Sequence, residues 1–262
     1  LSGDGYSELL RAGFNRLSIG VQSFSPENLG FLGRIHTPEQ AVESVKAARA
    51  AGFANISLDL IYGLPGRTEE RWRRDLESAL SLRPDHISCY ELTLEPGTPI
   101  GERGRKASEG RCAGMFMAAH EILSREGFRH YEVSNYALPG FESLHNSAYW
   151  SRRPYAGAGP SAHGFTGAVR YWNTPDTARY IGLLERNSLP REGEEEITPA
   201  KALREEVMLG LRTSRGVSLS LLPEEGVRML VKRGWLEIIG ERAVPTPEGM
   251  LWSDWMAREL TP

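Results

Sequence analysis

The sequence predicts an α/β fold in which the later part of a partial, TIM-like (β/α) barrel precedes a small helical domain similar to a winged helix. Two patterns indicate this fold. In the first half of the chain, short apolar and β-branched runs alternate with capped helices, as in a parallel βαβ sheet. Near the C-terminus, helices are followed by a β-hairpin. Only about three βα units are visible, whereas a closed barrel needs ~250 residues.

Regular elements are expected throughout the first half of the chain. Strands are expected at residues 15–21, 55–61, within 85–94 and at 130–134. Helices are expected at residues 37–51, 68–82 and 109–126. The first helix has the clearest start, because Thr37 can act as N-cap, Pro38 suits the first helical position and Gln40 completes a capping box. Gly52 ends that helix.

Ligands of parallel sheets lie beyond the carboxyl ends of the strands. The candidate loops are therefore those after Val21, Ile61 and Leu94. Residues 138–174 are rich in Gly, Pro, Tyr and Trp without a clear period, so we expect loops there, with one short strand at 169–172. Residues 191–197 (REGEEEI) are expected to be a charged, solvated connector.

The C-terminal part is predicted to be helical and then to form a hairpin. Helices are expected at 198–213 and 223–234, strands at 235–239 and 242–244, and a last helix from Thr246. The candidate recognition helix carries three basic residues against two acidic ones: Arg228, Lys232 and Arg233 against Glu224 and Glu225. Such a helix is not a basic stripe, so we expect a structural or docking role and no nucleic-acid partner.

Composition limits the function classes further. The net charge of −3 gives no global argument for nucleic-acid binding, and no apolar run approaches the ~18 residues of a transmembrane helix. The first residues lack the basic and apolar regions of a signal peptide, and Leu1 replaces an initiator Met, which suggests a fragment. Of the two cysteines, Cys89 is expected in a core strand and Cys112 on or near a helix. A cytoplasmic protein without disulfides is the expectation.

Seven linked segments carry a family resemblance. They are Gly20–Phe24 (GVQSF), Leu32–His36 (LGRIH), Asn55–Pro65 (NISLDLIYGLP), Pro84–Thr98 (PDHISCYELTLEPGT), Tyr131–Ala137 (YEVSNYA), His145–Trp150 (HNSAYW) and Gly157–Gly164 (GAGPSAHG). In this order and spacing they resemble the oxygen-independent coproporphyrinogen III oxidase family, and within it the HemW branch of haem chaperones. The resemblance covers essentially the whole chain.

The resemblance implies a radical S-adenosylmethionine (SAM) barrel with the HNSAYW loop region at residues 1–174 and a winged-helix-like domain at residues 175–262. The family's CxxxCxxC motif, which binds a 4Fe–4S cluster, is absent and would lie upstream of Leu1. We therefore expect an N-terminally truncated member. The cluster would belong to the full-length parent only, and this chain, with no catalytic residue assigned, is expected to be inactive as an enzyme.

Three positions match the family's SAM contacts. Gln22 is a plausible hydrogen-bonding partner, Arg34 can offer a fork of donors to the SAM carboxylate, and Asp59 can accept hydrogen bonds from ribose hydroxyls or the amino group. Each has an alternative. Gln22 could cap a turn, Arg34 could pair with Glu27, and Asp59 could orient loop amides, although an Asp inside an apolar strand is costly to bury without a partner.

The resemblance further implies that HNSAYW binds haem. His145 would be the axial ligand of the iron, Tyr149 and Trp150 would pack on the porphyrin, and Asn146 would orient the imidazole. The alternative is that Tyr149 and Trp150 are ordinary core aromatics and that His145 is a hydrogen-bonded loop residue. His163 is a second, weaker candidate ligand, and the other histidines are expected to be structural or exposed.

Three functions remain open. The preferred one is a haem chaperone that receives haem and passes it to acceptor proteins, including respiratory proteins at the membrane. The second is an oxygen-independent coproporphyrinogen III oxidase, which decarboxylates propionate side chains through radical chemistry. The third is an inactive, truncated family member that only binds a partner. The barrel motifs fit the first two equally, and the HNSAYW segment favours the first.

Overall fold

The computed structural model describes residues 3–261 of the chain. Contacts divide the protein into two compact units, unit 1 at Leu1–Glu142 and unit 2 at Ser143–Pro262, and each is described by itself. No helix within residues 3–261 is long and apolar enough to cross a membrane.

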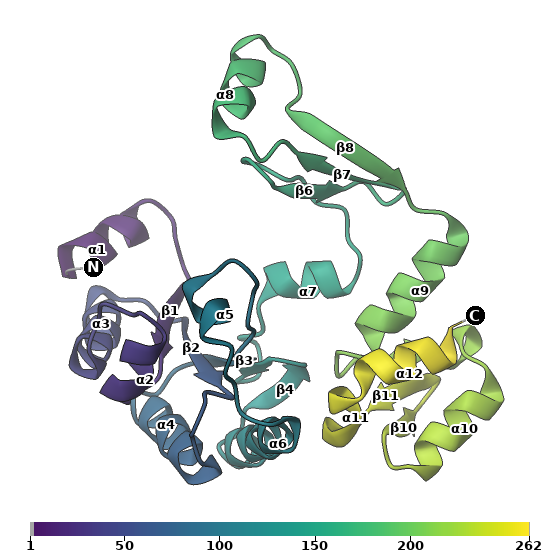
Figure 1. Ribbon diagram of the computed structural model, residues 1–262, viewed down its shortest axis with the longest axis horizontal. Coiled ribbons are helices and arrows are strands. Elements are labelled where there is room, and N and C mark those ends of the chain that lie inside the picture. Colours follow the sequence, from purple (N-terminus) through teal and green to yellow (C-terminus); the bar gives the residue numbers. More distant parts are fainter. Residues whose placement is uncertain (1–2, 262) are drawn as a thin grey trace. The chain divides into compact units, whose positions relative to one another are not determined.

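Unit 1 is an α/β unit built around one sheet (Figure 1). Its strands are β1 (Leu17–Gln22), β2 (Ile56–Tyr62), β3 (His86–Glu91), β4 (Arg129–Glu132) and β5 (Asn135–Ala137). Its helices are α1 (Gly3–Arg11), α2 (Pro26–Phe31), α3 (Pro38–Ala51), α4 (Glu69–Ser81), α5 (Pro99–Arg103) and α6 (Glu109–Arg125). The four expected strands and three expected helices are confirmed, whereas the short helices α1, α2 and α5 and the strand β5 were not predicted.

The sheet of unit 1 is mixed: its first three strands form the predicted parallel βαβ part, and the strands at one edge run antiparallel. The strand order is β1-β2-β3-β5-β4, with β1, β2 and β3 parallel. β5 runs antiparallel to both β3 and β4. Only Val133 and Ser134 separate β4 from β5, a connection that allows a hairpin but not the longer crossover that parallel strands require.

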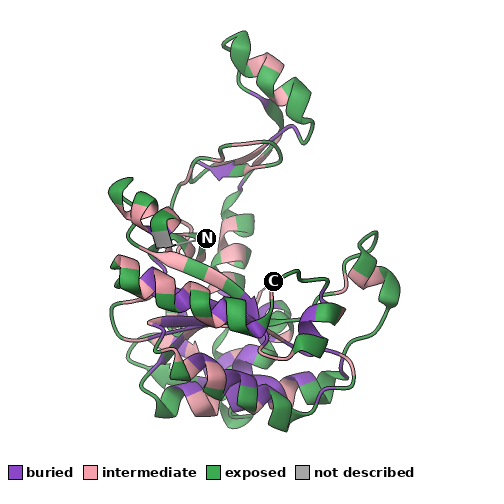
Figure 2. Ribbon diagram, turned by 90° about the vertical axis from the view of Figure 1, so that its left-hand side faces the viewer, coloured by how far each residue is buried: buried purple, intermediate pink, exposed green. Residues whose placement is uncertain are grey.

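The apolar face of the sheet carries the core of unit 1. Leu58, Leu60 and Ile87 are fully buried there, and α3 and α6 contact the neighbouring strands. Figure 2 shows the buried residues concentrated on these strands and on the helix faces toward them. The Trp72 indole of α4 donates a hydrogen bond of 2.8 Å to the Met115 carbonyl of α6, so the two helices are also tied to each other. The predicted capping box of α3 is present, with Thr37 and Gln40 bonding each other's backbone amides.

Unit 2 contains two small sheets (Figure 1). Its first part holds α7 (Leu144–Trp150), β6 (His163–Phe165), β7 (Val169–Asn173), α8 (Thr177–Glu185), β8 (Arg191–Glu196) and α9 (Pro199–Gly210). Its last part holds β9 (Val217–Ser218), a 3₁₀ turn (Leu219–Leu221), α10 (Glu224–Lys232), β10 (Leu236–Ile239), β11 (Arg242–Pro245), α11 (Pro247–Leu251) and α12 (Ser253–Leu260).

The expected connector at 191–197 is instead strand β8, which pairs antiparallel with β7. Cross-strand charge pairing explains the strand, because Arg170 of β7 lies opposite Glu195 and forms an ion pair of 3.3 Å with it. The paired strands β7 and β8 lie on opposite sides of residue 174 in the sequence, where a domain boundary was predicted. The contact division of the chain falls earlier, at Glu142, so the boundary at 174 stays a prediction.

The last part of unit 2 has the predicted helices and hairpin. β10 and β11 are antiparallel around Gly240-Glu241, and β9 completes a three-stranded sheet. A separate core lies beneath it, formed by residues from α9, α10, α12 and the strands, among them Val207, Leu211, Leu230, Leu236 and Met256. The arrangement of helices with a terminal hairpin agrees with the winged-helix-like expectation.

Candidate functional site

The first candidate site lies where β1 ends. Gln22 adopts the left-handed backbone conformation at φ 66° and is buried, and a bulge separates it from Gly20 in the pairing with β2. A Cβ added to Gly20 would lie 2.6 Å from Gln22 Nε2, so the glycine leaves the space that the Gln22 amide occupies. The backbone thus turns the Gln22 side chain back over the strand.

Asp59 lies beside this position, because Gly20 and Asp59 are register partners in the parallel pair β1–β2. Asp59 is half-buried, and its carboxylate accepts hydrogen bonds of 2.9 and 3.0 Å from the exposed Ser18 hydroxyl. The carboxylate is thus neither fully buried nor without a hydrogen-bond donor, which limits the cost of an Asp in an apolar strand. The carboxylate keeps acceptor positions for a ligand.

Arg34 is exposed and lies in the loop after α2. That loop is tied to the end of β1 by a contact of 3.1 Å between His36 Nε2 and the Val21 carbonyl oxygen. The alternative pairing of Arg34 with Glu27 is not formed. Glu27 pairs instead with Arg67 at 2.8 Å and with Arg71 at 3.5 Å.

A row of five aligned positions, four of them polar, crosses the whole sheet of unit 1 and was not predicted from the sequence. The register aligns Gly20 of β1, Asp59 of β2, Ser88 of β3, Asn135 of β5 and Glu132 of β4. Burial raises the pKa of Glu132, and hydrogen bonds from the Ser134 amide and the Asn135 side chain oppose that rise. The available signal was the alternation of polar with apolar residues in β1 and β2, which places Gly20 and Asp59 on one face of the sheet. We call these five positions the polar row.

The two cysteines do not fit an iron–sulfur cluster. Both are buried, and burial raises the pKa of Cys112 to about 11 and that of Cys89 further, so both remain thiols near neutral pH. No group of three or more His, Cys, Asp or Glu side chains within residues 3–261 could hold a metal ion. The expectation of a core cysteine in a strand and another on a helix is confirmed.

The second candidate site is the HNSAYW segment, which forms helix α7 and not the expected loop. The Ser143 hydroxyl caps the helix by accepting a hydrogen bond of 3.4 Å from the Asn146 amide. Because His145 and Tyr149 are four residues apart, they share one face of the helix. Their rings meet edge to face, with centroids 4.7 Å apart.

The contact between His145 and Tyr149 begins a longer series of rings. Tyr149 lies 4.5 Å from Tyr155, and Tyr155 lies 6.3 Å from Phe165, measured between ring centroids. We call His145, Tyr149, Tyr155 and Phe165 the aromatic row. His145 is exposed, and no hydrogen bond joins its imidazole to another described residue of unit 2. An accessible imidazole beside an aromatic ring fits an axial ligand of haem iron.

The remaining predicted haem contacts lie away from the aromatic row. Trp150 is half-buried and, one residue after Tyr149, points from another side of α7. Asn146 makes no hydrogen bond to the His145 imidazole among the described residues of unit 2. His163 is exposed on β6 and lies against Trp172, with ring centroids 5.9 Å apart.

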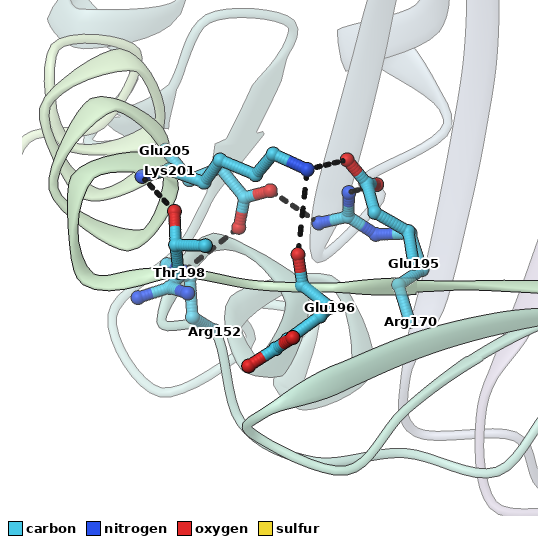
Figure 3. Close-up of polar contacts among 7 residues, drawn as sticks. All are labelled: Arg152, Arg170, Glu195, Glu196, Thr198, Lys201 and Glu205. Carbon is cyan, nitrogen blue, oxygen red and sulfur yellow. Dashed lines mark hydrogen bonds and ion pairs between the residues drawn. The ribbon is translucent and has the colours of Figure 1, made fainter.

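An ion-pair network fixes the end of α7 (Figure 3). Glu205 of α9 accepts from Arg152, just after α7, at 3.1 Å and from Arg170 of β7 at 2.6 Å. Both guanidinium groups also lie over the Phe165 ring, at 5.6 and 6.0 Å from its centroid. A hydrogen bond to Glu205 raises the pKa of Arg170 further, so this guanidinium stays charged. One carboxylate therefore joins the aromatic row to the C-terminal part of unit 2.

The chain matches two known protein families. The radical SAM superfamily matches residues 3–79, and the HemN C-terminal domain matches residues 197–252. Among solved structures, the chain is similar to coproporphyrinogen III oxidase (HemN) from Escherichia coli, with a TM-score of 0.80 and 20% identity over 99% of this chain and 67% of that one. This similarity shows the fold and confirms the expected α/β barrel part with its C-terminal domain.

Curated relatives are more similar in sequence. Haem chaperone HemW of Mycobacterium tuberculosis is 35% identical over 263 residues, which cover 97% of this chain and 67% of the relative. The HemW of Lactococcus lactis is 39% identical over 83% of this chain and 58% of its own length, and that of Bacillus subtilis is 38% identical over 88% and 62%. The chain thus spans about three fifths to two thirds of these relatives. It belongs to the HemW family within the radical SAM superfamily.

Proposed function

We propose that the chain is the haem-binding and haem-transferring part of a haem chaperone. The observation that carries this proposal is the exposed imidazole of His145 at the end of the aromatic row. Imidazole is a suitable axial ligand for haem iron, and a tyrosine ring four residues further along the same helix face can pack on a porphyrin. The curated relatives, which are named as haem chaperones, support the same function.

Transfer requires that haem can leave. A single accessible ligand on a short helix provides little enclosure, since α7 has no buried residue. Such a site favours exchange with an acceptor protein over permanent storage. The acceptors would be haem proteins, including respiratory proteins at the membrane. No comparable observation supports an oxidase function for this chain, because the solved structure of coproporphyrinogen III oxidase is similar to it in fold only.

The transfer test loads the chain with haemin and mixes it with apomyoglobin, which acts as a generic acceptor. We expect the absorption band to change to that of myoglobin faster than the same haemin is released into buffer. A transfer rate equal to the release rate would contradict a chaperone role while leaving haem binding intact. Tyr149→Ala should accelerate release, because it removes the ring that contacts His145.

We further propose that Gln22, Asp59 and Arg34 hold SAM at the carboxyl end of β1. Gln22 and Asp59 are neighbours across β1 and β2, and the Arg34 loop is tied to the same strand end. When bound with a cluster, SAM supplies radical chemistry in this superfamily. The residues described here would bind and orient the nucleoside and the carboxylate.

Equilibrium dialysis with labelled SAM tests this second proposal. Asp59→Asn should weaken binding about tenfold, because the neutral amide loses charge-assisted hydrogen bonds. Glu43→Gln, on α3, removes an equal charge from another part of unit 1 and should leave binding unchanged. Equal affinities for the original chain and Asp59→Asn would contradict the assignment of Asp59.

A further inference from the structure

An arginine-rich pocket lies at the end of α7. It has a volume of about 210 Å³, and its charged and aromatic lining consists of Trp150, Arg152, Arg215, Arg242 and Glu206. Three cations thus face one carboxylate. We call this feature the arginine pocket.

Two of the three cations, Arg215 and Arg242, form no ion pair with a carboxylate in the described part of unit 2. Arg215 donates to the Ser151 hydroxyl, and Arg242 donates to the backbone oxygens of Arg215 and Gly216 at 2.6 and 2.7 Å. No ion pair joins Arg215 or Arg242 to a described carboxylate of unit 2. By contrast, Arg152 is neutralised by Glu205. The pocket therefore carries uncompensated positive charge held in place by neutral groups.

At Gly216, which lines the pocket, the backbone packs closely against the backbone of Ala243. Gly216 has φ 62°, and a Cβ there would lie 2.1 Å from the Ala243 carbonyl oxygen. Only glycine allows this approach, which brings the Gly216 carbonyl within reach of the Arg242 guanidinium. The orientation of Arg242 is thus fixed by backbone, before any ligand binds. A preorganised, planar guanidinium suits a carboxylate, which accepts two parallel hydrogen bonds from it.

The size of the pocket limits its ligand. Sites for whole cofactors usually measure about 300–1,000 Å³, so 210 Å³ holds a substituent and not a macrocycle. The location relates it to the aromatic row, because Arg152 both lines the pocket and lies over Phe165. Trp150, the last residue of HNSAYW, contributes a wall.

We propose that the arginine pocket binds a carboxylate side arm of the tetrapyrrole whose ring lies along the aromatic row. This inference rests on the proposed haem-binding function and adds a second, iron-independent contact to it. The pocket selects porphyrins that carry free propionates. Arg215 and Arg242 supply the charge, and Trp150 covers the alkyl part of the arm.

The test uses the His145→Ala chain, so that iron ligation plays no part. Metal-free protoporphyrin and its dimethyl ester are titrated at the same low detergent concentration, with porphyrin fluorescence as readout. We expect the diacid to bind about tenfold more tightly than the ester. Arg215→Gln with Arg242→Gln should abolish that preference and leave ester binding unchanged.

Two control variants make the result interpretable. Arg228→Gln removes one positive charge from α10, as many as Arg215→Gln alone removes from the pocket, and should preserve the diacid preference; Arg228 pairs there with Glu224. Arg215→Gln alone changes an exposed residue whose loss leaves the backbone contacts of Arg242 in place, so it should fold and lose severalfold in diacid affinity.

Equal binding of diacid and ester, or an undiminished preference in the double variant, would overturn the proposal. The two proposals can also fail separately. If the diacid preference persists but the haemin spectrum does not depend on His145, the arginine pocket is supported. Only the assignment of His145 as axial ligand is then contradicted.

Discussion

The two candidate sites of this chain are held in place by different means. Gln22 and Asp59 belong to a sheet whose other face is a fully buried core, and their positions follow from strand register. His145 belongs to a seven-residue helix without buried residues, which is fixed by a cap and by ion pairs of Arg152. The first arrangement suits a ligand that must be oriented for chemistry. The second suits a ligand that must be released.

The largest effect expected from this comparison concerns the core under the polar row. Leu60→Ala should lower the free energy of unfolding of unit 1 by about 3 kcal/mol, because the removed side chain is fully buried. Hydrogen exchange should show faster opening of β2 and β3 and unchanged opening of α9. Leu189→Ala, at a side chain that is 71% exposed, is the matched control and should have little effect. Equal losses in both variants would contradict the assignment of the core.

The next effect concerns Glu205, which joins two arginines. Glu205→Ala should destabilise unit 2 by about 2 kcal/mol, less than a fully buried pair would lose, because its partners remain partly exposed. Hydrogen exchange of the α7 and α9 amides measures this loss. Glu192→Ala breaks the exposed pair with Arg179 and should cost about 0.5 kcal/mol or less. If Glu205→Ala were equally mild, α7 would not depend on the network.

A smaller effect is the pH dependence of unit 1. Burial lowers the pKa of His130 from 6.5 to about 3, so the unfolded chain takes up a proton there that the folded chain refuses. This histidine therefore contributes its full stability above pH 6.5 and loses it as the pH falls toward 3, by about 1 kcal/mol per pH unit. The raised pKa values of Asp75 and Glu132 act in the opposite direction, near their own ranges.

The measurement is urea unfolding at several pH values between 6.5 and 5, comparing the original chain with His130→Gln. The variant should show a shallower decline in stability, whatever its stability at pH 7. His163→Gln, at an exposed residue of unit 2, is the control for replacing a histidine and should leave the unfolding of unit 1 unchanged. Parallel pH profiles for the original chain and His130→Gln would show that His130 does not titrate as its burial requires.

The regular part of the fold could be predicted from the sequence because its signals are local. The capping box at Thr37 and the apolar run around Asp59 each specify an element within a few residues. β8 was missed because its sequence looks solvated until Arg170 is placed opposite Glu195. The polar row was missed for a related reason, since its members come from five strands and meet only through register.

The candidate site was predicted unevenly. The resemblance pointed to His145 and Tyr149, which the structure brings together. It also pointed to Trp150, which the helix turns away from that pair and into the wall of another pocket. A six-residue motif does not reveal the faces of a helix unless the helix itself is recognised, and the residue that caps α7, Ser143, lies outside the motif.

The most direct test of haem binding is a haemin titration of the original chain, followed by absorption spectroscopy, beside His145→Ala and His163→Ala. The second variant is a matched control, because it removes another exposed histidine of unit 2. We predict a saturable shift of the Soret band in the original chain and in His163→Ala, and its loss in His145→Ala. The same shift in all three chains, or none in the original chain, would contradict His145 as the haem ligand.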